Sequence, residues 1–277
     1  MQKSLNIWLA LLLLMPVGAL ATSSKFADLK GNPGLRSASA IVLDSSGNVI
    51  YGKDVDTVRP IASITKLMTA MVILDAKLDL DEKITITKAD RDMIRLTGSR
   101  LEYGARLTRR DLLLLALMSS ENRAATALGR TFPGGMRAFI NAMNAKAASL
   151  GMSHSGFADP AGLKSQNVST AKDLALMVEA ADRYPLITQA TTTKRKEVHP
   201  YLRRGPLTYG NTNRLLKNAN WDIELSKTGY INEAGRCLVM RANIEGEEVS
   251  IVLLNSFGKL TPFGDSNRLR KWMLATT

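Results

Sequence analysis

The sequence is short of cysteine and histidine: its 277 residues include one cysteine, Cys237, and two histidines, His154 and His199. A single thiol excludes an internal disulfide framework and any zinc or iron–sulfur site built on several cysteines. Two histidines without a paired motif argue against a histidine-rich metal site, so we expect no metal and no other cofactor. Three apolar residues follow Cys237, which predicts a thiol packed as a small apolar side chain.

Long apolar runs are absent after the N-terminus. The N-terminus itself has one charge, Lys3, an apolar run over residues 7–15, and small residues ending at Ala21. This order is typical of a secretory signal peptide. A proline and a glycine interrupt the run before it reaches the ~20 residues that span a bilayer, so an uncleaved anchor is the weaker alternative. We expect a signal peptide over residues 1–21, a mobile leader over 22–37 and no stable membrane anchor.

Acidic residues are in the minority, with 25 Asp and Glu against 37 Lys and Arg, for a formal net charge of +12. Such a balance attracts polyanions, membrane surfaces or acidic glycans. Export argues against nucleic acid as the partner and favours anionic polymers of the cell envelope. A hydrophobic share of 45% excludes general disorder and suits a globular domain.

Hydrophobic periodicity divides the chain into strands at both ends and helices in the middle. Thr108 and Thr170 each stand three residues before an aspartate, a pattern typical of helix N-caps. The expected elements are a hairpin over 39–51, helices over 63–77, 112–118, 123–130, 136–150, 170–183 and 265–274, and strands over 224–231, 236–244 and 248–255.

The order of these elements predicts an α/β (α+β) fold. Strands at the two ends cannot bury their faces separately, so we expect one antiparallel sheet from residues 38–60 and 221–275, flanked by helices. A helix-rich lobe over about 80–210 would pack against this sheet and complete a catalytic domain over 38–277. The cleft between lobe and sheet is the expected place of the site.

The motif Ser-x-x-Lys occurs three times, beginning at Ser63, Ser169 and Ser256. The second and third copies fit a helix cap and a turn. Ser63 opens a strongly apolar helix, and Lys66 lies one turn further on the same face. Desolvation there would favour a neutral amine, which can serve as base for a serine nucleophile in acyl-enzyme chemistry. The alternative is an N-capping serine with an extended surface lysine.

Two further motifs lie at suitable places. Ser120 and Asn122 occupy a short break between two helical segments, and Lys227-Thr228-Gly229 lies in the middle of an expected strand. Glycine weakens a strand unless something approaches its backbone closely, and a substrate lying along this strand is such a reason. Lys227 would attract its carboxylate. The ordered combination of the three motifs is far more specific than any one of them.

Residues 59–70, 117–124, 169–171 and 226–230 resemble the low-molecular-mass penicillin-binding proteins, the serine D-alanyl-D-alanine peptidases of the periplasm. The resemblance covers about residues 38–275 and implies the serine β-lactamase/DD-peptidase-like fold. Ser-Glu-Asn at 120–122 and the short C-terminus are most similar to the D-alanyl-D-alanine endopeptidases of this family.

The resemblance implies a role for each motif residue. Ser63 would attack the carbonyl of a peptidoglycan peptide cross-link, Lys66 would accept its proton, and Ser120 would relay a proton to the leaving amine. The substrate would be bound by Asn122, Lys227, Thr228, Gly229 and Tyr230, with the N–H groups of Ser63 and Tyr230 forming the oxyanion hole. β-Lactams would be covalent inhibitors, and the enzyme would be periplasmic.

Three alternatives stay open. A class A β-lactamase needs a glutamate that positions water, and only Glu179, Glu197 and Glu224 lie between Arg123 and Lys227, none in the Glu-x-x-Leu-Asn pattern. A D-alanyl-D-alanine carboxypeptidase of this family generally has a longer chain, with a second β-domain and an amphipathic C-terminal helix. A catalytically idle cell-wall-binding protein is the third alternative. All three motifs are intact here, which argues against it, because an idle protein would not need them.

Overall fold

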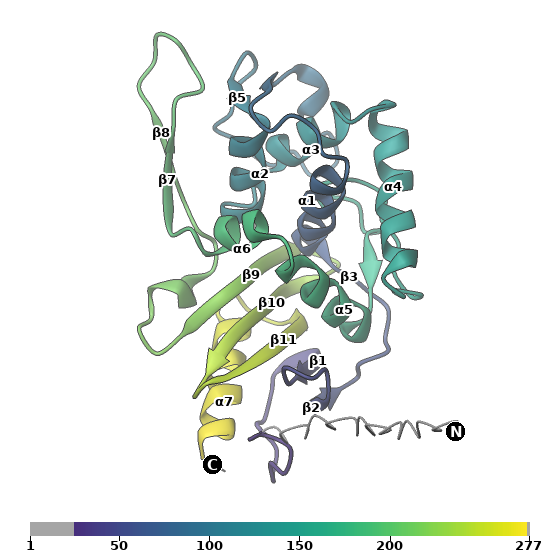
Figure 1. Cartoon of the computed structure of the whole chain (residues 1–277), viewed down its shortest axis with the longest axis vertical. Coiled ribbons are helices and arrows are strands. Elements are labelled where there is room, and N and C mark those ends of the chain that lie inside the picture. The colour runs from purple at the N-terminus through teal and green to yellow at the C-terminus, as the bar shows by residue number, and fades with distance from the viewer. Residues whose placement is uncertain (1–24, 276–277) are drawn as a thin grey trace, which may run out of the picture.

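The computed structural model describes residues 25–275. Its main feature is a five-stranded antiparallel sheet in the order β2-β1-β11-β10-β9, to which both ends of the chain contribute (Figure 1). This confirms the expected fold class. The strands are β1 (Ser37–Leu43), β2 (Val49–Lys53), β9 (Asp222–Ile231), β10 (Gly235–Ile244) and β11 (Glu247–Ser256).

Alternating side chains of the sheet build two apolar cores. Ala40 and Val42 of β1 join the core under α7 (Thr261–Leu274), whereas Ile41 and Leu43 join the core shared with the helical lobe. The period of two in a strand sends neighbouring side chains to opposite faces. Because both faces of the sheet are covered, β10 and β11 are buried over most of their length, and β2 and β9 are the two edge strands.

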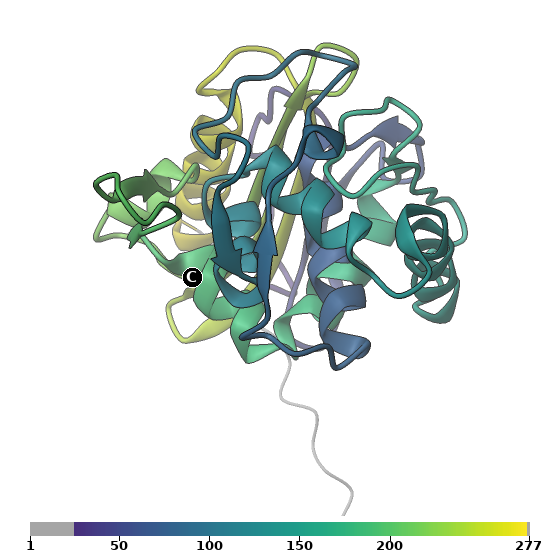
Figure 2. The ribbon, with the colours of Figure 1, turned by 90° about the horizontal axis from the view of Figure 1, so that it is seen from above.

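The helical lobe lies against one face of the sheet, as Figures 1 and 2 show. Thr108 and Thr170 cap two of its helices as expected, because their side chains accept hydrogen bonds from the N–H groups of Asp111 and Asp173 at 3.0 Å. The lobe contains α1 (Thr65–Asp75), α2 (Arg109–Met118), α3 (Asn122–Arg130), α4 (Gly135–Ser149), α5 (Ala171–Asp182) and α6 (Pro185–Thr192).

Short elements that periodicity did not predict connect these parts. Three two-stranded sheets have two to four residues a strand, too few or too polar to show an alternating pattern. They pair β3 (Arg59–Pro60) with β6 (Val168–Ser169), β4 (Lys83–Thr85) with β5 (Arg106–Thr108), and β7 (Arg195–Val198) with β8 (Leu207–Gly210). Three single turns of 3-10 helix are η1 (Ala62–Ile64), η2 (Lys88–Asp90) and η3 (Arg214–Lys217).

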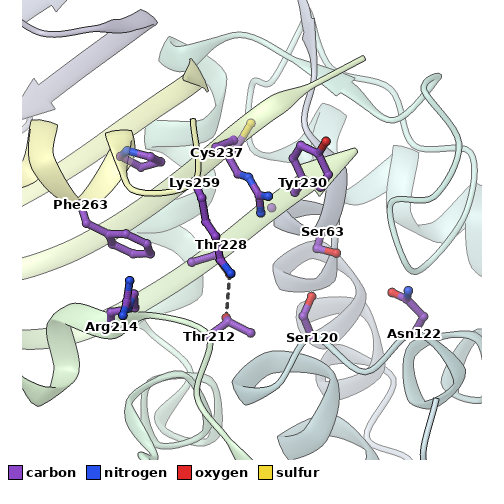
Figure 3. Close-up of a pocket in the computed structure, with 13 residues that line it drawn as sticks. Ser63, Ser120, Asn122, Thr212, Arg214, Thr228, Tyr230, Cys237, Lys259 and Phe263 are labelled. Carbon is purple, nitrogen blue, oxygen red and sulfur yellow. Dashed lines mark hydrogen bonds between the residues drawn. The ribbon is translucent and has the colours of Figure 1, made fainter. Parts of the chain in front are cut away.

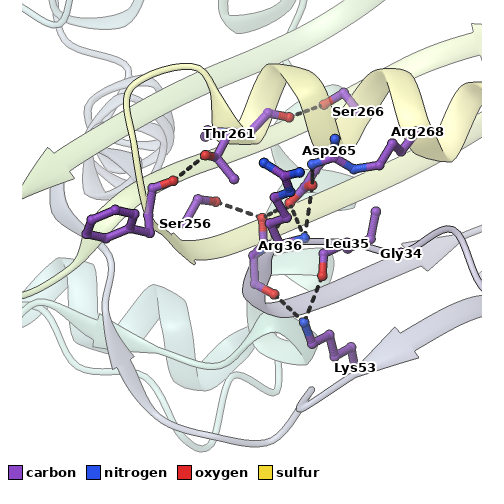
Figure 4. Close-up of polar contacts among 12 residues, drawn as sticks. Gly34, Leu35, Arg36, Lys53, Ser256, Thr261, Asp265, Ser266 and Arg268 are labelled. Carbon is purple, nitrogen blue, oxygen red and sulfur yellow. Dashed lines mark hydrogen bonds and ion pairs between the residues drawn. The ribbon is translucent and has the colours of Figure 1, made fainter.

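The described part of the segment 22–37 contacts the body of the protein, which composition alone did not indicate. Phe26 is buried in the core beside α7, and Trp272 donates a hydrogen bond to the carbonyl of Lys30 at 2.8 Å. Asp265 accepts hydrogen bonds from the N–H groups of Arg36 and Ser37 at 3.0 and 2.7 Å (Figure 4). These contacts fix the entry of the chain into β1.

The expected signal peptide over residues 1–21 lies outside the described residues. Between residues 25 and 275, no helix is both long and apolar enough to cross a bilayer.

Candidate active site

Ser63 lies in the 3-10 turn η1, directly before the buried helix α1. The preceding residue, Ala62, has φ of 48°, a left-handed conformation that non-glycine residues adopt at a cost of about 1–2 kcal/mol. The turn lies between the strand pair β3–β6 and the body of α1. This constrained turn brings Ser63 to the surface of the cleft, while the rest of α1 stays in the core.

Lys66 is fully buried one turn after Ser63. Its Nζ donates hydrogen bonds to Ser63 Oγ at 2.8 Å, to Asn122 Oδ1 at 2.8 Å and to the carbonyl oxygen of Ala161 at 2.7 Å. Burial lowers the pKa of Lys66 to about 7, against the opposing effect of nearby carboxylates, of which Asp159 is the strongest. The amine is therefore placed and tuned to exchange a proton with the serine hydroxyl near neutral pH.

The loop after α4 supplies the third partner of Lys66, and sequence reasoning missed it. The Asp159 carboxylate accepts hydrogen bonds from the N–H groups of residues 161–164 at 2.7–3.2 Å and from the Asn167 side chain at 2.6 Å. Several donors around one buried carboxylate fix the loop conformation. The carbonyl of Ala161 is thus held in place against Lys66.

Gly162 makes the contact between this loop and η1 so close that only glycine fits. It has φ of +76°, and a Cβ built there would lie 1.9 Å from the carbonyl oxygen of Ala62. The loop and the turn that carries Ser63 therefore pack backbone against backbone.

Ser120 and Asn122 lie at the junction of α2 and α3, as the motif predicted. Ser120 has φ of 60° and accepts a hydrogen bond from Lys227 Nζ at 3.0 Å. Asn122 contacts Lys66 through its amide oxygen and Thr97 Oγ1 through its amide nitrogen, the latter at 2.9 Å. The junction thus links the two buried lysines.

Lys227 lies on β9 and is buried, with 1% of its surface exposed. Its Nζ also donates a hydrogen bond to the carbonyl oxygen of the next residue, Thr228, at 2.9 Å. Burial and the proximity of Lys66 lower the pKa of Lys227 well below its ordinary value. Among the described residues no carboxylate forms an ion pair with it, so an arriving carboxylate would supply the counter-charge that favours the protonated form of Lys227.

β9 runs past the Ser63 turn at Gly229, which explains the glycine in mid-strand. A Cβ at Gly229 would lie 2.9 Å from the carbonyl oxygen of Ile61 and 3.2 Å from the N atom of Ser63. Tyr230 follows, half exposed, with the Arg236 guanidinium 3.7 Å from its ring centre. Gly229 thus allows the outer edge of the sheet and the nucleophile turn to form one wall of the cleft.

The motif residues meet in a cavity of about 400 Å³. Ser63 and Ser120 point toward one another in its middle, and Asn122 lies at one end (Figure 3). Lys66 and Lys227 are buried behind the lining. The lining also contains residues that were not predicted for the site, namely Thr212, Arg214, Arg236, Lys259, Pro262 and Phe263. Of these, Lys259 ends the Ser-x-x-Lys copy that begins at Ser256.

Of the other candidate side chains, Cys237 lines the same cavity (Figure 3), whereas Ser169 and Ser256 are not part of its lining. Ser169 and Ser256 are buried in hydrogen bonds with Ser155 and Ser37 at 2.7 Å. Both contacts are structural, but the cap of α5 is Thr170 and not Ser169, because the Thr170 side chain accepts the hydrogen bond from the Asp173 N–H. Cys237 is buried, and burial raises the pKa of its thiol to about 11. Over residues 25–275, no three His, Cys, Asp or Glu side chains are grouped so that they could hold a metal ion.

A serine hydrogen-bonded to a buried lysine, a Ser-x-Asn turn and a Lys-Thr-Gly strand around one cavity define the class of serine enzymes that contains the DD-peptidases and the serine β-lactamases. Within that class, residues 27–258 match the family described as D-alanyl-D-alanine carboxypeptidase, peptidase S11. The chain belongs to this family of serine hydrolases, which act on peptidoglycan.

The comparisons with individual proteins agree. The D-alanyl-D-alanine endopeptidase of Pseudomonas aeruginosa is 51% identical over 243 residues, 86% of this chain and 77% of the relative. The Escherichia coli enzyme of the same name is 47% identical over 267 residues, 96% and 86% of the two chains. The solved DD-transpeptidase of Streptomyces K15 superposes on this chain with a TM-score of 0.82 at 28% identity. The superposition covers 89% of this chain and 100% of the transpeptidase.

Proposed function

We propose that the chain is a periplasmic D-alanyl-D-alanine endopeptidase that cleaves peptidoglycan cross-links through an acyl-enzyme on Ser63 and is inhibited by penicillin. The observation that carries the proposal is the contact of 2.8 Å between Lys66 Nζ and Ser63 Oγ, in which the lysine is buried and has a pKa of about 7. A weak hydroxyl nucleophile needs an adjacent base, and a partly neutral lysine is one.

In the first step, Ser63 Oγ forms a bond to the scissile carbonyl carbon while its proton passes to Lys66. The tetrahedral oxyanion accepts hydrogen bonds from the N–H groups of Ser63 and Tyr230, which belong to adjacent segments of the cleft wall. The proton then reaches the leaving amine through Ser120, the C–N bond breaks, and the acyl group stays on Ser63.

The substrate is bound by the α2–α3 junction and by β9. Asn122, at the junction, orients the substrate amide on the acyl side. Lys227 and Thr228 bind the carboxylate next to the leaving nitrogen, and the peptide runs along the outer edge of β9 past Gly229. A substrate carboxylate supplies the counter-charge that Lys227 lacks. Water then hydrolyses the ester and restores the free Ser63.

The relatives support endopeptidase over carboxypeptidase activity. The two at 51% and 47% identity are both named endopeptidases, whereas carboxypeptidases of Bacillus subtilis and Streptomyces are 32% identical. The features of residues 1–21 support export to the periplasm.

Fast turnover of penicillin is not proposed. In the loop after α4, the carbonyl oxygen of Ala161 contacts Lys66, and the Asp159 carboxylate is occupied by backbone donors, so this loop offers no free carboxylate to position a water. We therefore expect a long-lived penicilloyl enzyme.

The test is covalent labelling of the mature protein with a fluorescent penicillin, followed by digestion of purified muropeptides. We expect Ser63→Ala to abolish labelling and cleavage with an unchanged melting curve. Ser169→Ala, which alters another copy of the same motif, should still be labelled. Labelling of a folded Ser63→Ala protein would exclude the acyl-enzyme, and loss of D-alanine from pentapeptides faster than cleavage of cross-linked dimers would favour the carboxypeptidase.

A further inference from the structure

The cavity continues beyond the motif residues into a cationic and apolar end. Thr228 Oγ1 donates a hydrogen bond to Thr212 Oγ1 at 2.7 Å, and these two side chains lie near the middle of the cavity. In Figure 3, Arg214 and Phe263 lie beyond them, at the end opposite Asn122.

Three separate elements converge on this end. Arg214 begins η3, Lys259 lies in the loop between β11 and α7, and Phe263 is in the first turn of α7. The same loop exposes two apolar side chains close to Lys259 in the chain, Phe257 at 94% and Leu260 at 55%. Exposed apolar groups of this size beside a cavity are typical of binding surfaces.

The cations at this end have no anionic partner of their own. Neither Arg214 nor Lys259 forms an ion pair or a side-chain hydrogen bond with any residue between 25 and 275. Arg95, elsewhere in the described part of the chain, shows the opposite case, because it is paired with Glu233 at 2.8 Å. Two uncompensated positive charges in a concave site attract an anion and raise its local concentration.

The proposed function fixes what lies at this end. The carboxylate beside the leaving nitrogen is bound by Lys227 and Thr228, so whatever continues from the leaving residue passes Thr228 and Thr212. When a terminal D-alanine leaves, nothing continues. When a cross-link is cut, the leaving group is an entire acceptor peptide, which carries a further carboxylate at its own C-terminus.

We infer that Arg214, Lys259 and Phe263 form a specificity site for the acceptor peptide of the cross-link, in which the two cations bind its second carboxylate and the ring packs on its apolar part. This inference rests on the proposed endopeptidase function and deepens it. The site contacts only the leaving peptide, so it selects cross-linked substrates without taking part in the reaction at Ser63.

The experiment compares three reactions of the full mature protein: cleavage of a cross-linked muropeptide dimer, release of D-alanine from an uncross-linked pentapeptide, and acylation by penicillin. The variant Arg214→Ala/Lys259→Ala should lower kcat/KM for the dimer about tenfold or more. Pentapeptide cleavage and penicillin acylation should stay within about twofold, because neither substrate reaches the site. The control Arg137→Ala/Lys172→Ala removes two exposed cations from α4 and α5 and should change none of the three rates.

A second arm tests the charge itself. The unaltered enzyme should cleave a dimer whose acceptor peptide ends in an amide more slowly than a dimer whose acceptor peptide ends in a carboxylate. The double variant should cleave the two dimers at the same rate. Equal dimer cleavage by the double variant and the unaltered enzyme would overturn the inference, and so would a parallel loss on all three substrates. If the unaltered enzyme labels with penicillin but leaves dimers intact, the endopeptidase function fails together with it.

Discussion

The pKa of Lys66 leads to a quantitative prediction for the rate of acylation. A lysine with the ordinary pKa near 10.4 is neutral in less than about 0.1% of molecules at pH 7, whereas one with a pKa of about 7 is neutral in about half of them. Burial therefore increases the population of the basic form roughly a thousandfold. The structural source of this effect is the complete enclosure of Nζ by Ser63, Asn122 and Ala161.

The second-order rate of penicillin acylation should follow the neutral fraction of Lys66. Well below neutral pH the rate should fall about tenfold for each unit of pH, so that pH 5 gives about 2% of the rate at pH 7. The rate is measured by stopped-flow fluorescence between pH 5 and 7, with circular dichroism at each pH to show that the fold persists.

Three variants separate the pKa of Lys66 from other causes of a pH dependence. Glu121 raises the pKa of Lys66 electrostatically, so Glu121→Gln should move the acid limb to lower pH, whereas Glu197→Gln, an exposed carboxylate on β7, should leave it in place. Lys66→Arg keeps the positive charge throughout and should be slow at every pH. An acid limb that survives in Lys66→Arg, or a rate independent of pH between 5 and 7, would refute the assignment of Lys66 as the base.

Three further predictions follow from the packing and the charges. Gly162→Ala should lower the free energy of unfolding by roughly 2–4 kcal/mol and slow acylation, because the new Cβ would overlap a carbonyl oxygen. Thermal melts check this, and the control Gly156→Ala, whose Cβ would make ordinary contacts, should leave the stability almost unchanged. Lys227→Ala should lower the second-order acylation rate by the equivalent of roughly 2–5 kcal/mol, and an unchanged rate would contradict carboxylate binding. Although burial alone would raise the pKa of Asp265, hydrogen bonds from Ser37 and Arg36 hold it below its ordinary value. Above the pKa that Asp265 has in the unfolded chain, its carboxylate therefore stabilises the fold, and this effect is lost as pH falls through the pKa that it has in the folded protein. Asp265→Asn should thus lower the free energy of unfolding by about 2 kcal/mol at pH 7, measured by urea unfolding, and by less in acid.

The sequence predicted the parts of this protein that depend on periodic side chains. The sheet from both chain ends, most of the large helices and the threonine caps follow from apolar periods and from local hydrogen bonding. The helix expected from residue 63 begins as a 3-10 turn, with α1 starting at Thr65. The last helix begins at Thr261 rather than 265, because Pro262 suits the first turn of a helix.

The parts that the sequence did not predict depend on contacts between distant segments. The loop around Asp159 has no period, and its role appears only when its carbonyl reaches Lys66. Arg214 had no motif, and Lys259 belonged to a Ser-x-x-Lys copy that was interpreted as a turn, because nothing local shows that η3 and the loop before α7 meet. Helix α6 and the hairpin β7–β8 are short and mixed in polarity, so tertiary packing decided their conformation.

The strand order has a consequence for how the chain folds as it is made. β1 obtains its main partner from β11, with Ser37 opposite Ser256, and until then it has only the hairpin with β2, which is marginal alone. The sheet can therefore close only after nearly all of the polypeptide has been synthesised, and α7 with Asp265 closes it at the same moment. Pairing over such a distance makes the final step slow. An unfinished chain has helices but no complete sheet, so Ser63 and Lys227 come together only in the finished molecule.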